Sequence, residues 1–353
     1  MAEVKSIEAL AVHFTAGAAA GAFLARSSAN PWFLSGGLFL VLASLLFAVL
    51  RTGRPALLFP AFLLCGAACF LTDALSGGGG TPAWAAVPAV RLRAFIDTLP
   101  FPSESTAPLL KAFLTGDRSG LSRETAAVFR TSGASHLLAL SGLHMGILYL
   151  ILSKVFLPLG NSPAAKGFRY AAVLGAAGFF TLMTGASPSI VRAFLFIVLN
   201  ETARLLHRPR NPVKVLSAAL LVQLVLTPSA VTSVGFQLSY LAMAGIFPLY
   251  PVLEGWYPQG FRHDPVRKVW QAAALSISCQ AFTGPLAWFR FHAFPKYFLL
   301  TNLLAMPLTT LLMGTAVTTL LLGGLGCRAD LPVRATDFLA GTLVRVLEII
   351  STM

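Results

Sequence analysis

Residues 215–253 read VLSAALLVQLVLTPSAVTSVGFQLSYLAMAGIFPLYPVL, and this stretch decides the fold class. It contains no Asp, Glu, Lys or Arg. It is about twice as long as the ~20 apolar residues that cross a bilayer as one helix. Pro228, within Thr227-Pro228-Ser229, cannot continue a helix. The stretch therefore predicts two membrane spans divided near Pro228.

The composition of the whole chain gives the same indication. Of 353 residues, 56% are hydrophobic and only 11% are charged, and the mean hydropathy is +0.76. Soluble domains carry roughly 25% charged residues, so this chain cannot cover a surface that faces water. These numbers argue against a cytosolic enzyme, a disordered regulator, a disulfide-rich secreted module and a coiled coil. They predict an all-α fold in which a polytopic bundle of helices lies in a membrane.

Apolar stretches along the chain predict about ten transmembrane helices. The N-terminal stretch has no basic region before it and no small-residue cleavage site after it, so we expect a span rather than a signal peptide. The tail 336–351 is a candidate eleventh span. The ten expected spans are 9–26, 32–50, 56–75, 137–157, 169–186, 188–206, 213–227, 232–250, 266–289 and 299–325.

The basic residues predict the orientation of these spans. The net charge is +13, and Lys and Arg gather in cytoplasmic loops of membrane proteins. With a cytoplasmic N-terminus, most loop cations fall on the inner side, although Arg290 and Lys296 fall on the outer side. An excess of cations would also suit a polyanionic substrate. The inner cations are Arg51, Arg54, Lys166, Arg169, Arg208, Arg210, Lys214, Arg262, Arg267 and Lys268.

Residues 76–136 resemble a soluble segment and are expected to form an extracytoplasmic loop region. The segment begins with Ser76-Gly77-Gly78-Gly79-Gly80, which is typical of a flexible linker. Two short helical patterns follow, near 104–115 and 122–130.

Two histidines stand at the start of the fourth expected span. His136, Leu140 and His144 are spaced at i, i+4 and i+8, which predicts one shared helix face. The imidazoles could line a passage, together with the nearby Ser141. Alternatively, they could form hydrogen bonds between helices.

Arg192 lies five positions into the span that begins at Pro188. A guanidinium at that depth costs a few kcal/mol unless it is paired or hydrated. Its planar fork suits phosphate oxygens, so we consider a phosphate-binding or pore-lining role. The alternative is a structural ion pair, for example with Glu201 or Asp117.

Further polar side chains lie within expected spans, among them Gln237, Ser239 and Asn302. Each alone is typical of a contact between helices, but together they suggest a hydrated interior. Helix breaks are expected at 185–188, 283–285 and 306–307, where a proline interrupts an apolar run. Irregular backbone at membrane depth is tolerated where it lines a cavity.

The motifs that are missing from the sequence restrict the chemistry. There is no G-x-x-x-x-G-K-[ST] and no H-E-x-x-H, and the four cysteines form no C-x-x-C pair. We therefore predict no catalytic residues, no metal and no cofactor. Ser141 and His144 could face each other at i, i+3, but no acid lies nearby in the sequence. This leaves an intramembrane serine enzyme as a minor alternative.

Several stretches together resemble a known family. They are FLTGDRS at 113–119, SHLLALSGLHMG at 135–146, TGASPS at 184–189 with Arg192-Ala193, and GFQLSY at 235–240. Their order and spacing are similar to those of the competence domain of the ComEC family, the membrane channel for DNA uptake in natural transformation. The stretch from Pro295 to Pro307 with Asn302 also fits, and the resemblance covers roughly 105–325.

The resemblance implies a multi-pass protein of the cell inner membrane that passes one DNA strand into the cytoplasm. It implies a separate helicase and a separate DNA receptor as partners, besides single-stranded DNA and membrane lipid. A homo-oligomer is left open. From the resemblance we expect the channel core alone, without the OB-like and metallo-β-lactamase-like domains of full-length members. The expected organisation is N-terminal spans at 1–75, a linker or shortened extracytoplasmic segment at 76–104 and the competence domain at 105–353.

The main hypothesis is thus a path for single-stranded DNA. Its expected lining is His136, Ser141, His144, Arg192, Gln237, Ser239 and Asn302, with Asp117 and Arg118 at the outer mouth. The alternative is a small-solute or ion transporter, which would also use buried polar residues and broken helices.

Overall fold

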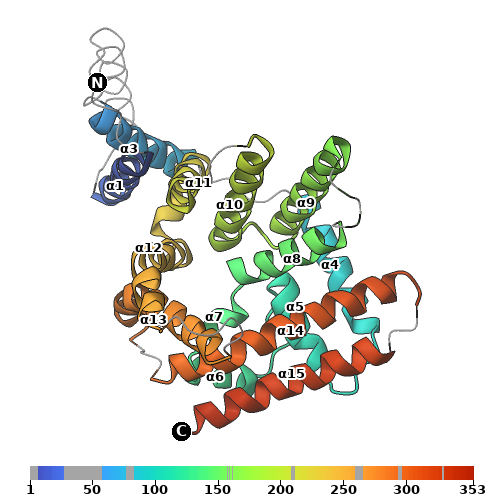
Figure 1. Cartoon of the computed structure of the whole chain (residues 1–353). Helices are drawn as coiled ribbons and strands as arrows, with labels where there is room; N and C mark the ends of the chain where they lie inside the picture. Colours follow the sequence, from blue (N-terminus) through green and yellow to red (C-terminus); the bar gives the residue numbers. More distant parts are fainter. Residues whose placement is uncertain are drawn as a thin grey trace. The chain divides into compact units, whose positions relative to one another are not determined.

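The computed structural model describes residues 7–27, 58–76, 83–156, 158, 160, 162–207, 211–258, 265–292, 296–327 and 330–353. Within these ranges every regular element is a helix and there is no strand (Figure 1). The all-α prediction is therefore confirmed. The expected span 32–50, the glycines at 77–80 and several inner cations (Arg51, Arg54, Arg208, Arg210 and Arg262) lie outside the described residues.

The chain divides into two compact units, formed by segments that alternate along the sequence. The first unit contains α1 (Ile7–Ser27), α3 (Leu58–Ser76), α11 (Pro212–Leu226), the short 3-10 helix η3 (Pro228–Thr232), the first part of α9 (Pro163–Met183) and most of α10 (Pro188–Leu205). The second contains α4 (Ala83–Thr98), α5 (Thr106–Thr115), α6 (Arg123–Thr131), α7 (Ser135–Leu138), α8 (Gly142–Val155), most of α12 (Val234–Gly255), α13 (Pro265–Phe291), α14 (Phe298–Gly324) and α15 (Asp330–Ser351).

In the first unit, α1 packs directly against α3. Gly17 and Gly21 form a G-x-x-x-G pattern on α1, and a Cβ added at Gly17 would lie only 1.7 Å from the Leu63 carbonyl oxygen. A Cβ added at Gly66 on α3 would lie 2.0 Å from the carbonyl oxygen of Phe14. Small residues at these positions let the two backbones touch, as in many helix pairs within membranes.

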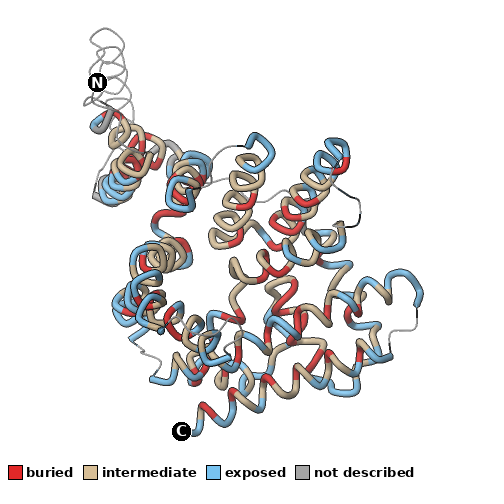
Figure 2. The backbone as a smooth tube through the Cα atoms, viewed as in Figure 1, coloured by how far each residue is buried: buried red, intermediate tan, exposed pale blue. Residues whose placement is uncertain are grey.

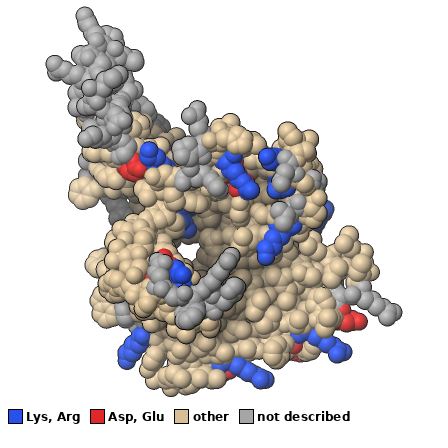
Figure 3. All heavy atoms as spheres, viewed as in Figure 1, with Lys and Arg blue, Asp and Glu red and all other residues tan. Residues whose placement is uncertain are grey.

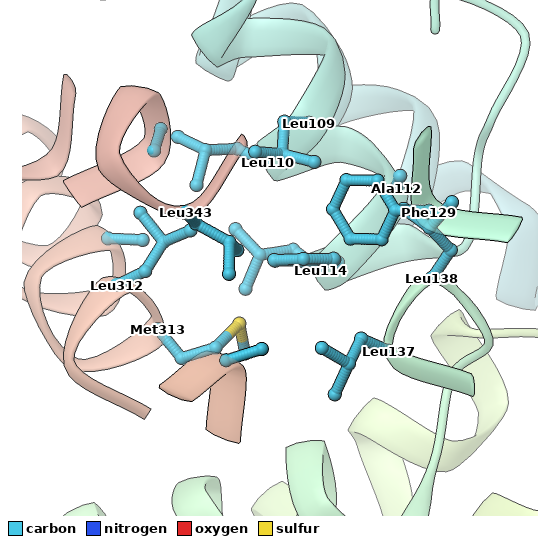
Figure 4. Close-up of a cluster of buried hydrophobic side chains, with 14 of the residues drawn as sticks. Leu109, Leu110, Ala112, Leu114, Phe129, Leu137, Leu138, Leu312, Met313 and Leu343 are labelled. Carbon is cyan, nitrogen blue, oxygen red and sulfur yellow. The ribbon is translucent and has the colours of Figure 1, made fainter. Parts of the chain in front are cut away.

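In the second unit, a hydrophobic core joins α5, α6 and α7 to α14 and α15. Figure 4 shows Leu109, Leu110 and Leu114 of α5 facing Leu312, Met313 and Leu343. Asp337 of α15 adds a polar link, because its carboxylate accepts hydrogen bonds from Ser103 and from the Thr106 hydroxyl at the start of α5. The segment that carries the 113–119 motif is thereby anchored to the C-terminal helices.

The segment 76–104 contains more structure than the expected linker. Residues Ala83–Thr98 form α4, which continues through Pro88, and its Ala89 and Ile96 are buried. The two predicted short helices are confirmed as α5 and α6. The boundaries predicted for the three domains stay a prediction.

The predicted helix breaks have mixed outcomes. The chain does break at Pro228, between α11 and α12, and at 184–187, between α9 and α10. The breaks expected at 283–285 and 306–307 are wrong, because α13 continues through Pro285 and α14 through Pro307. A proline in a membrane helix is tolerated when local adjustments satisfy the carbonyl group that it leaves unpaired.

Each expected span within the described residues coincides with a helix, although α8 begins only at Gly142. Among these helices, α12 and α14 are long and apolar enough to cross a membrane, judged by length and composition. Ten spans are therefore not established. Only 17% of the apolar window of α12 and 33% of that of α14 is buried, and Figure 2 shows exposed and intermediate residues along α12.

Candidate functional site

The 113–119 motif forms a tight turn after α5. The helix ends at Thr115, and Gly116 adopts a left-handed conformation with φ of 76° while its N–H bonds the carbonyl of Ala112. Glycine reaches this conformation without the steric cost of a side chain. The turn thereby places Asp117 and Arg118 just beyond the end of α5.

Asp117 holds the turn together. Its carboxylate accepts hydrogen bonds from the Ser119 hydroxyl at 2.7 Å and the Ser119 backbone N–H at 3.0 Å. It also pairs with Arg93 of α4, with 2.6 Å between Oδ2 and Nη1. The bonds from Ser119, followed by the pairing with Arg93, hold the pKa of the Asp117 carboxyl well below its usual range. Asp117 is therefore an anion with a structural role in this turn.

Arg118 connects this turn to the 135–146 motif. Its Nε donates to the carbonyl of Leu138 at 3.1 Å. A Cβ added at Gly116 would lie 2.7 Å from Cδ1 of Leu140. The two motifs that suggested a family resemblance are thus packed against each other, although residues 120–134 separate them in the sequence.

The shared helix face predicted for His136 and His144 is wrong. Helix α7 ends at Leu138, Ala139 is extended, and α8 begins after Ser141. The physical reason is a capping box at Ser141. Its hydroxyl accepts from the Leu143 N–H at 3.3 Å, and its own N–H donates to Nδ1 of His144 at 3.2 Å. A helix start at this place interrupts the i, i+4, i+8 register.

The two histidines consequently have different surroundings. His136 is exposed, and its Nδ1 lies 3.1 Å from the carbonyl oxygen of Gly133. The imidazole of His144 is buried and packs edge-on against Phe113, with 5.8 Å between ring centroids. Within the described part of the chain, Nε2 of His144 is buried without a hydrogen-bond partner. Ser141 Oγ lies 3.1 Å from the other ring nitrogen, Nδ1.

Arg192 lies in the first turns of α10 and is half-buried. The chain before this helix is irregular, with positive φ at Gly185 and Ala186. Of the two acids considered as partners of Arg192, Glu201 pairs with Arg204 at 3.6 Å and Asp117 pairs with Arg93. The structural ion pair considered for Arg192 stays a prediction. Asn200 bonds its neighbour Glu201 at 3.5 Å.

The remaining predicted residues are half-buried. Gln237 donates from Nε2 to the Val231 carbonyl at 2.9 Å, which closes the turn before α12. Ser239 follows on the same helix. Asn302 lies in the first turns of α14, beside Thr301, whose hydroxyl donates to the Ser132 carbonyl at 2.6 Å.

The structure thus brings some of the predicted residues together. One packed region of the second unit contains Asp117, Arg118, Ser141 and His144. The second unit also contains His136, Ser239 and Asn302, which lie outside this region. Arg192 and Gln237 belong to the first unit.

Sequence reasoning missed two members of the packed region. Arg93 was assigned to a linker, although Ala89, Arg93 and Ile96 repeat at helical spacing. Phe113 was quoted only as a motif letter, yet its ring also packs edge-on against Phe129, with 6.3 Å between centroids.

The charges and donor groups give further information on the chemistry of the site. On the face drawn in Figure 3, Lys and Arg side chains are more widespread than Asp and Glu. In the described ranges, His, Cys, Asp and Glu form no group of three or more that could hold a metal ion.

Comparison with known proteins decides the family. The sequence profile of the competence protein family matches residues 113–353, from Phe113 in the first motif to the C-terminal helix. The chain belongs to the competence protein family. The matched region contains both packed motifs, whereas Arg93, which pairs with Asp117, lies before it.

Individual relatives agree with this family. The chain is 26% identical to ComE operon protein 3 of Bacillus subtilis over 209 residues, which are 59% of this chain and 25% of that protein. It is 31% identical to competence protein ComA of Neisseria gonorrhoeae over 180 residues, 48% of this chain and 25% of that protein. Recombination protein 2 of Haemophilus influenzae is 25% identical over 219 residues, 58% of this chain and 27% of that protein.

The chain thus spans about a quarter of the length of the curated relatives that it matches. No solved structure matches it.

Proposed function

We propose that this competence-family chain forms a membrane channel through which single-stranded DNA enters the cytoplasm during natural transformation. The observation that carries the proposal is the family match over residues 113–353. It is supported by the mutual packing of the 113–119 and 135–146 motifs, which makes one structural unit of the most specific part of that match.

We place the chain in the inner membrane with about ten spans and a cytoplasmic N-terminus. The exposure of α12 and α14 supports a membrane location, since the apolar core helix of a soluble protein is mostly buried. The distribution of Lys and Arg supports the orientation.

In this proposal the path is lined by Arg192, Gln237 and Asn302, with His136, Ser141, His144 and Ser239 as further polar lining. Arg192 is half-buried in the first turns of α10, just after the irregular backbone at Gly185 and Ala186. A guanidinium in that setting suits passing phosphate groups. The contact is made to the DNA backbone, so it is independent of base sequence and should weaken as salt increases.

Asp117 and Arg118 would give the outer mouth a fixed shape. Both side chains are engaged in the turn, Asp117 with Arg93 and Ser119 and Arg118 with the Leu138 carbonyl. Their proposed role is therefore to hold the entrance rigid, whereas the contacts with DNA are made deeper in the path.

The proposal gives the chain no catalytic step and no nucleotide hydrolysis. A separate helicase would supply the force, because the sequence has no P-loop, and a separate receptor would deliver the DNA.

The test is uptake of labelled DNA by a transformable host in which the gene for this chain has been deleted. We expect deletion to abolish internalisation and the wild-type chain to restore it. The Arg192→Ala variant should restore about a tenth or less, since a charged hydrogen bond is worth about 1.5–3 kcal/mol. Lys268→Gln, an exposed cation on α13, serves as the control and should restore full uptake.

Normal DNA uptake in the deletion strain would contradict the channel. If the same strain instead lost accumulation of a small solute, the transporter alternative would hold. The enzyme alternative predicts that Ser141→Ala loses uptake while the protein still inserts. Ser141→Thr keeps a hydroxyl that can cap α8, so an equal loss in this variant would point to an enzyme.

A further inference from the structure

An open apolar groove runs along one face of α13 in the second unit. It is lined by Ile277, Gln280, Ala281, Gly284, Pro285 and Trp288, together with Phe298 of α14, and encloses about 450 Å³. The lining positions on α13 repeat every three to four residues, so they share one helix face. They cover about 16 Å of the helix axis, at 1.5 Å per residue.

The floor of the groove is made of small residues and contains few polar groups. Gly284 is buried, while Ala281 and Pro285 are exposed along the open side. Pro285 has no N–H to donate to the carbonyl of Ala281, and Gln280 is the one polar side chain of the lining. A long apolar group fits such a groove better than a polar ligand.

One end of the groove is aromatic and basic. Trp288 and Phe291 are 57% and 60% exposed on the last turns of α13, and Tyr297 lies just before α14. Arg290, His292 and Lys296 are exposed at the same end of the two helices. The sequence contains no Asp or Glu from Pro265 to Ala329. Trp and Tyr beside cations are typical of the boundary between the acyl chains and headgroups of a membrane.

We infer that this groove binds one anionic phospholipid. An acyl chain would lie along Ile277, Ala281 and Trp288, and the headgroup phosphate would meet Arg290 and Lys296. The inference rests on the proposed membrane location. It also gives a role to Arg290 and Lys296, the two cations expected on the outer side although most loop cations are expected on the inner side. Single-stranded DNA could also use an aromatic and basic surface, but the apolar groove and the exposed apolar side chains along α13, such as Leu275 and Phe282, favour lipid.

The test uses quenching of Trp288 fluorescence in the purified full-length protein. The protein is placed in phosphatidylcholine vesicles with a fixed mole fraction of phosphatidylglycerol, and bromine is attached to the acyl chains of one lipid or the other. Subtracting the signal of Trp288→Phe isolates the contribution of Trp288. We expect brominated phosphatidylglycerol to associate with this site roughly 25-fold more strongly than brominated phosphatidylcholine, since Arg290 and Lys296 are each worth roughly fivefold near an anionic headgroup.

The double variant Arg290→Gln/Lys296→Gln should remove this preference, whereas Lys268→Gln at the other end of α13 should keep it. Equal quenching by both lipids in the wild type would show ordinary contact with bulk lipid and overturn the inference. Protection of Trp288 from brominated lipid by an added oligodeoxythymidine would show that DNA occupies the groove, and would also overturn it. The measurement does not involve transport, so its failure and the failure of the proposed channel can be told apart.

Discussion

At the scale of single residues, Asp117 links the turn after α5 to α4. It accepts from two groups of Ser119 and from Arg93, and those donors lose a charged partner in Asp117→Asn. Hydrogen bonds to charged groups are worth about 1.5–3 kcal/mol, and partial exposure reduces that value. We expect the variant to lose about 1–2 kcal/mol of stability, measured as thermal unfolding in detergent, while the exposed Glu104→Gln remains close to wild type.

The pH dependence of this difference has a definite sign. The pKa of Asp117 is lowered in the folded chain by Ser119 and Arg93. Its contribution is therefore fully present at pH values above its ordinary range, near 4, and is lost as the pH falls toward the lowered value. The stability gap between wild type and Asp117→Asn should be constant near neutral pH and shrink below about pH 4. A gap that stays the same under acid would contradict this assignment.

Gly116 provides a second test at this scale. Its φ of 76° is unfavourable for other residues, and a Cβ would lie 2.7 Å from Leu140. We expect Gly116→Ala to lose about 1–3 kcal/mol of stability, since a left-handed conformation alone costs roughly 1–2 kcal/mol. Gly120→Ala in the same loop is the matched control, because its Cβ would meet Pro108 at an ordinary 3.5 Å. Equal losses of stability in Gly116→Ala and Gly120→Ala would mean that the left-handed conformation of Gly116 and its approach to Leu140 do not contribute to stability.

The candidate site shows which residue-level features could be predicted from sequence. The order of the motifs at 113–119 and 135–146 indicated the family, whereas the contact between them is seen only in the structure. The sequence analysis wrongly placed His136 and His144 on one helix face. The apolar run continues across Ala139 and Leu140, so hydropathy does not show that one helix ends there and that a new one begins after Ser141. Recognising Ser141 and His144 as a capping pair would have revealed the break.

At the scale of the elements, α1 and α3 test the close packing of helices. Gly17→Leu should separate these helices, because no side chain fits within 1.7 Å of the Leu63 carbonyl oxygen. We expect a loss of several kcal/mol, comparable to or larger than overpacking of a core, seen as reduced thermal stability or reduced yield of folded protein. Ala20→Leu, on the exposed side of the same helix, should be tolerated. Unchanged stability in Gly17→Leu would contradict the packing described for this pair.

Most helices could be predicted from apolar runs and from Pro or Gly at their ends, since these features act locally. The exceptions are also local in origin. Helix α4 was missed because Pro88 and its charged residues resemble a loop, although a buried face at Ala89 and Ile96 offsets that tendency. Pro285 and Pro307 were expected to end helices, but α13 and α14 continue through both.

At the scale of the whole molecule, family membership and the exposed apolar helices both support the proposed role in DNA uptake at a membrane. The chain matches the competence family over 113–353 and carries a net charge of +13. Residues proposed to line one path come from both compact units. Local sequence patterns predict single helices but do not encode contacts between residues far apart in the chain, so the lining of the path stays a proposal.

The most direct test of the central claim is capture of DNA during uptake. A photoreactive amino acid is placed at position 192, 237 or 302 in cells that take up labelled DNA, and at the exposed positions Leu321 and Val222 as controls. We predict DNA crosslinks at the three path positions only, and their disappearance when uptake is blocked. Equal labelling at the control positions, or none at 192, 237 and 302 while DNA still enters the cell, would contradict a DNA path through this chain.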